Sequence, residues 1–163
     1  MALTRSIQPE YMIGMPSVPT ETIKEGASQS FLKGEVLVIS SGYAVVGTAG
    51  DDNPVLGTIL GISCMAGRNV STYPDLQYIP ALPGVVFSAQ LQNAAATAAV
   101  AQTNVGTVYG LNVTSNQWWV DTDDTTDERV RVIGYKDPIG TVNGVVYFVF
   151  LPNTTIFSST AAN

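Results

Sequence analysis

The chain has 163 residues and a mass of 17.2 kDa, which is the size of one domain or of one domain with an extension. Charged residues make up 12% of the sequence, about half of the ~25% usual in soluble domains, and 45% of the residues are apolar. A surface so poor in charge favours self-association, so we expect partners to cover part of it. The net charge is −6, and the seven Lys and Arg residues are too few for a basic nucleic-acid-binding patch.

Histidine is absent from the sequence, which excludes Ser-His-Asp and Cys-His catalysis and the usual zinc sites. Cys64 is the only cysteine, so no disulfide can form within the chain, and we expect a small buried apolar residue there rather than a reactive thiol. No signal-peptide core follows Met1, and no apolar run approaches the ~18 residues of a transmembrane helix. The sequence therefore predicts a protein made in the cytoplasm, with no membrane partner, no nucleic-acid partner and no cofactor.

Residues 1–30 differ in character from the rest of the chain. Three prolines interrupt any helix, and the apolar residues recur with the period of neither a strand nor a helix. We predict an extended N-terminal arm that is ordered against another chain, and the alternative is an arm folded back on its own domain. With the first arrangement, deletion of residues 1–25 is expected to leave a folded domain. The apolar residues expected to make the arm's contacts are Ile7, Tyr11, Met12 and Ile13.

From residue 31 onward, short apolar runs bounded by Gly, Pro and Asn predict β-strands. The expected strands cover residues 35–39, 43–46, 55–63, 77–82, 85–91, 107–113, 117–121, 129–135 and 145–151. One short Ala-rich helix is predicted over residues 93–101, and it would have to pack on the domain because so short a helix is marginal alone. The pattern predicts an all-β, mainly antiparallel barrel or sandwich over residues 31–163. The closing strand is apolar on both faces, so we expect both to be buried, one of them by another subunit.

Adjacent tryptophans occupy positions 118 and 119 within one expected strand. Neighbouring residues of a strand point to opposite faces, so one of Trp118 and Trp119 is expected in the core. The other tryptophan has three possible roles: contact with a partner, a second core layer, or a stacking platform for a sugar.

An acidic cluster spans residues 121–128 and carries five carboxylates. Such a cluster could hold calcium, but it lacks the glycine and the spaced final glutamate of an EF-hand loop. The alternatives are a solvated turn between strands and a surface that faces basic residues of a partner. Carboxylates could also form a glycosidase pair, which the sequence alone cannot place at the required separation, and we expect no enzymatic activity.

The order of these segments resembles the head decoration, or cement, proteins of tailed bacteriophages. The similarity covers residues 31–157 and consists of a pattern of glycines and apolar strands. Its parts are the opening FLKGEVLV (31–38), VLGTILG (55–61), the Ala-rich segment, VGTVYGL (105–111), QWWVD (117–121) and the closing FLP (150–152).

The resemblance implies a structural role without chemistry. Members of that family commonly form trimers on the outside of the capsid, where they bridge neighbouring major capsid proteins. The expected partners are therefore the major capsid protein and two further copies of this chain, and the expected location is the outer capsid surface of the virion. The residues expected at these interfaces are Ile7, Tyr11, Met12, Ile13, Trp118 and Trp119. The alternative function is a carbohydrate- or receptor-binding β-module of a virion fibre.

Overall fold

The computed structural model describes residues 7–47, 53–54, 57–94, 96–114 and 117–157, which form strands and two short 3-10 helices. The strands of the first half are β1 (Gln8–Met12), β2 (Glu21–Lys24), β3 (Val36–Ser40), β4 (Tyr43–Val46), β5 (Asn53–Pro54), β6 (Ile59–Ser63) and β7 (Asp75–Pro80). Those of the second half are β8 (Val85–Asn93), β9 (Ala96–Thr97), β10 (Val108–Thr114), β11 (Gln117–Asp121), β12 (Val130–Tyr135) and β13 (Val145–Phe150). The 3-10 helices are η1 (Gln102–Asn104) and η2 (Pro152–Thr154). The predominantly β character predicted from the sequence is confirmed.

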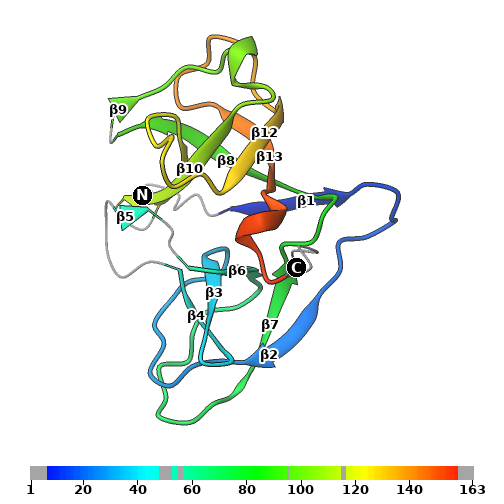
Figure 1. Ribbon diagram of the computed structural model, residues 1–163, viewed down its shortest axis with the longest axis vertical. Coiled ribbons are helices and arrows are strands. Elements are labelled where there is room, and N and C mark those ends of the chain that lie inside the picture. The colour runs from blue at the N-terminus through cyan, green and yellow to red at the C-terminus, as the bar shows by residue number, and fades with distance from the viewer. Residues whose placement is uncertain (1–6, 48–52, 55–56, 95, 115–116, 158–163) are drawn as a thin grey trace, which may run out of the picture.

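The strands form two sheets. The large sheet has eight strands in the order β1-β8-β11-β10-β12-β13, with β5 paired to β10 and β9 to β8. Its β13 also pairs with β8, so the path of strands returns to β8. The small sheet has five strands in the order β2-β7-β6-β3-β4. Figure 1 shows the small sheet below most of the large one, with β1 between the two halves.

Buried and half-buried side chains alternate along β13 and most of β11 in the large sheet. In β13, Val146, Phe148 and Phe150 are buried, whereas the residues between them are half-buried. One face of β13 is therefore buried within one chain and the other is half-buried, and burial of the second face by another subunit stays a prediction. Trp118 on β11 packs inward in the same way.

A single hydrophobic cluster joins the two sheets. Residues of the small sheet such as Val36 and Ile62 share it with Phe87, Trp118 and Phe148 of the large sheet. A second, smaller cluster around Leu37, Leu60 and Leu76 fills the small sheet alone. Burial of this apolar area supplies the main favourable term for folding and fixes how the sheets meet.

Two short strands among the first 30 residues join these sheets in the part that the structure describes. β1 pairs antiparallel with β8, and β2 pairs antiparallel with β7. Ile7 is 1% exposed and Glu25 is 0% exposed. The arrangement matches the alternative in which the segment folds back on its own domain, and residues 1–6 lie outside the described part of the chain. Deletion of residues 1–25 would therefore remove a strand from each sheet.

The prediction of a short helix over residues 93–101 is wrong. Asn93 ends β8, residues 96–97 form β9, and β9 pairs back onto β8. The backbone beyond β9 bonds to the loop before β13, with the Val100 N–H donating to the Thr141 carbonyl at 3.0 Å. The helix propensity of alanine is worth only a few tenths of a kcal/mol per residue, so these pairings outweigh it in a segment of this length. Residue 95 lies outside the described residues.

Candidate interaction surface

Three large apolar side chains are exposed where β1 ends and the chain turns away. Tyr11 is 47% exposed, Ile13 is 66% exposed and Met15 is 57% exposed. We call these three residues the β1 surface. In Figure 1 this turn, in blue, extends sideways from the molecule beyond β1.

The local sequence explains why these residues face outward. Met12 packs against the shared core, so its neighbours Tyr11 and Ile13 point away from it. The Ile13 N–H donates to the Gly84 carbonyl at 2.9 Å, which extends the pairing of β1 with the start of β8. Gly14 then adopts a φ of +78°, a conformation that favours glycine, and allows the chain to turn.

The β1 surface continues onto β13 and is held by polar contacts. The rings of Tyr11 and Tyr147 meet edge to face, with centroids 6.5 Å apart. Beside them the Lys136 ammonium group donates to Glu10 Oε1 at 2.8 Å, and the Ser88 hydroxyl donates to the same oxygen at 2.5 Å. The partial burial of Glu10 would raise its pKa, but the hydrogen bonds from Lys136 and Ser88 outweigh this and lower it. β1 is thereby tied to β8 and to the loop between β12 and β13.

The structure separates the six interface residues predicted from the sequence into three groups. Tyr11 and Ile13 are exposed and available for contact. Ile7 and Trp118 are each 1% exposed and belong to the core, and the half-buried Met12 packs against it. Trp119 lies on the opposite face of β11 from Trp118 and is half-buried. The expectation that one tryptophan is a core residue is confirmed.

Sequence reasoning missed Met15 and Tyr147 as members of this region. Tyr147 carries a usable signal, because it lies between the inward-facing Val146 and Phe148 and so must point to the other face of β13. Met15 carries no periodic signal, since it follows a turn. Its exposure depends on how Met12 docks, and the sequence does not reveal that contact.

The acidic cluster uses its carboxylates to hold its own backbone. Asp121 is 4% exposed, and its Oδ1 accepts from the N–H groups of Ala94 at 3.0 Å and Asp123 at 3.1 Å. Asp124 Oδ1 accepts from the N–H of Asp127 at 2.9 Å. Among the described residues there is no group of three or more His, Cys, Asp and Glu side chains placed to bind a metal ion. The geometry is that of a turn capped by its own aspartates.

Comparison with known proteins gives no relative: no family model, curated protein or solved structure matches the chain. No helix in the described ranges has the length and apolar character needed to cross a membrane.

Proposed function

We propose that this protein is a decoration, or cement, protein that binds the outer surface of a phage capsid as a homotrimer. It would stabilise contacts between major capsid proteins and carry out no catalysis. The observation that carries the proposal is the β1 surface, three exposed apolar residues on a segment fixed to the domain by strand pairing and by an ion pair. This surface offers a partner apolar contacts on a rigid support.

Composition and strand order support the same proposal. The charged fraction of 12% suits a surface that is covered in a permanent assembly, and the net charge of −6 is unfavourable for a nucleic-acid partner. The resemblance over residues 31–157 supplies the class of partner. In this proposal the ring of strands from β8 through β11, β10, β12 and β13 back to β8 is a small barrel that presents β1 on its outside.

Stabilisation would arise from many weak contacts that act together. Burial of a large apolar side chain contributes about 1.5–3 kcal/mol, so a single β1 surface binds weakly. A trimer presents three such surfaces at fixed spacing, and its second and third contacts form at a high effective concentration. Because the trimer binds the assembled shell and not the free subunits, mass action favours the shell.

The first test is the number of copies in purified particles, measured by quantitative mass spectrometry against the major capsid protein. A ratio near one to one is expected of a protein that covers the lattice. A handful of copies per particle would place the protein at a tail, fibre or vertex instead, and absence from particles would overturn the proposal.

A second test addresses the β1 surface directly. The double substitution Ile13→Ser with Met15→Ser is expected to lower capsid occupancy at least tenfold in a co-sedimentation assay with undecorated shells. Its matched control is Val70→Ser, which removes an apolar side chain 40% exposed in the loop between β6 and β7. Unchanged occupancy of the double variant, with Val70→Ser also unchanged, would remove the β1 surface from the proposal.

The alternative of a glycan-binding module has less support. Glycan binding needs an exposed tryptophan on which a sugar can stack. Trp118 is 1% exposed and Trp119 is half-buried. If glycans do bind, Trp119→Ala is expected to abolish saturable binding in a glycan array.

A further inference from the structure

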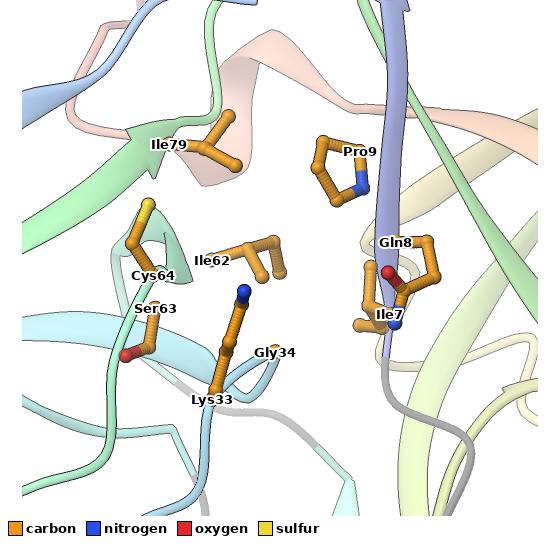
Figure 2. A pocket seen from close by; sticks show the side chains of 9 residues that line it. All are labelled: Ile7, Gln8, Pro9, Lys33, Gly34, Ile62, Ser63, Cys64 and Ile79. Atoms are coloured by element: carbon orange, nitrogen blue, oxygen red, sulfur yellow. The ribbon is translucent and has the colours of Figure 1, made fainter.

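A cavity of about 170 Å³ opens where β1 of the large sheet meets the small sheet. Figure 2 shows side chains from both sheets around it, with Ile7, Gln8 and Pro9 on one side and Ile62, Cys64 and Ile79 on the other. The full lining is Ile7, Gln8, Pro9, Lys33, Gly34, Ile62, Ser63, Cys64 and Ile79. None of the functions considered so far uses this cavity.

The walls of the cavity are mainly apolar and belong to the core. Ile7 and Ile62 are each 1% exposed, and Ile79 is 8% exposed. The Ser63 hydroxyl is already engaged with Met65 in the turn after β6. A cavity of about 150 Å³ with apolar walls is large enough to hold a benzene ring. The body of any ligand would therefore be compact and apolar.

Lys33 gives the lining of the cavity a positive charge. It is the only charged residue in the lining, and its ammonium group points toward Ile62 in Figure 2. No ion pair joins Lys33 to a carboxylate in the part of the chain that the structure describes, and its side chain is exposed. Its charge is also felt by Cys64, where burial raises the pKa of the thiol and Lys33 partly offsets that rise.

We propose that this cavity binds a small monocarboxylic acid with a compact apolar body, of the size of benzoate. The apolar body would lie against Ile7, Ile62 and Ile79, and the carboxylate would pair with the Lys33 ammonium group. Since β1 forms one wall, an occupied cavity would also hold β1 more firmly against the small sheet.

The size of the ligand and the exposure of Lys33 set the expected affinity. A ligand of about nine non-hydrogen atoms with ordinary efficiency binds in about the millimolar range. Because Lys33 is exposed, water and salt screen its attraction, so its loss should weaken benzoate binding only about threefold to fivefold. The apolar part of the site should not depend on salt.

Cys64 provides a direct readout, because it lines the cavity and is the only cysteine in the chain. The experiment measures the rate at which iodoacetamide alkylates Cys64 in the full chain at pH 8.5, with increasing sodium benzoate or benzyl alcohol. Glutathione alkylated under the same conditions corrects for effects on the reagent. The variants are Lys33→Gln and, as the matched control, Lys24→Gln, which removes an exposed lysine outside the cavity.

We expect benzoate to slow alkylation with a saturable dependence, and benzyl alcohol to require about threefold to fivefold higher concentration for the same protection. Lys33→Gln should abolish that difference, whereas Lys24→Gln should preserve it. Absence of protection by either compound would overturn the site. Equal protection by both compounds in the unaltered protein would overturn the carboxylate specificity.

Discussion

At the scale of single residues, Gly61 on β6 leaves no room for a side chain against β7. A Cβ built on Gly61 would lie 2.0 Å from the Ile79 carbonyl oxygen, and this backbone atom cannot rotate aside. Gly61→Ala is therefore expected to lower the free energy of unfolding by about 3 kcal/mol or more, measured by urea denaturation.

The control for Gly61→Ala is Gly134→Ala in β12. A Cβ there would meet only Tyr147 Cδ2, at an ordinary contact distance of 3.6 Å. A change within about 0.5 kcal/mol is expected. Similar losses in the two variants would contradict the steric argument.

Glu10 should make stability depend on pH. Its pKa in the folded protein lies below the usual 4.5, so its contribution is complete above that value and disappears as the pH falls through the folded pKa. Glu10→Gln is expected to cost about 0.5–1 kcal/mol at pH 7, because its partner Lys136 is half exposed, and less at pH 3, where protonation of Glu10 weakens the ion pair. Urea denaturation at pH 7 and at pH 3 measures the loss of unfolding free energy at each pH.

Glu21→Gln is the control for the pH experiment, since Glu21 is an exposed carboxylate on β2. It should show no comparable difference between pH 7 and pH 3. A cost of Glu10→Gln that is as large at pH 3 as at pH 7 would mean that Glu10 acts through packing and not through its charge.

The candidate site was only partly predictable from single residues. The sequence identified Tyr11 and Ile13 as apolar residues with no place in a regular pattern, and their exposure agrees with a contact role. It assigned the same role to Ile7, which lies in the core because β1 docks on β8, nearly 80 residues away. Lys33 and Ile79 meet at the cavity only through the packing of two sheets, and no local pattern indicates this.

At the scale of elements, the segment around β1 has some apolar side chains in the core and others exposed. Ile7→Ala would leave a cavity in the shared core and is expected to lower the free energy of unfolding by about 2–4 kcal/mol. Ile13→Ser alters a side chain that is 66% exposed and should change stability by less than about 0.5 kcal/mol. Thermal and urea denaturation of the two variants measure this difference in lost stability. Equal losses would mean that β1 is only loosely attached to the core.

The strands from residue 36 onward were largely predictable, because each is short, apolar and closed by a turn residue. β4 and β11 have the expected bounds, β13 ends one residue earlier than expected, and β3 begins and ends one residue later than expected. Pairing with β8 was not predictable, and the helix prediction for the Ala-rich segment failed for that reason. Residues 96–97 and β1 become strands because β8 is there to pair with them, whatever their own propensities.

At the scale of the whole molecule, the shared hydrophobic cluster should make the two sheets unfold together. The emission of Trp118 and Trp119 reports on the large sheet, and the accessibility of the Cys64 thiol reports on the end of β6 in the small sheet. Both probes are expected to give the same urea midpoint within error. Two separate midpoints would show that the large and small sheets are independent folding units.

β8 is the strand on which the rest of the large sheet depends. Over residues 85–93 it pairs with β1, β9, β11 and β13, so it joins strands from near the beginning and near the end of the described chain. During synthesis, residues 145–150 leave the ribosome long after β8 has been made, and until then residues 87–90 of β8 lack their partner on one edge. This part of the sheet therefore forms late, with the slow kinetics of long-range pairing, and its strand edge is open to aggregation until β13 pairs with it.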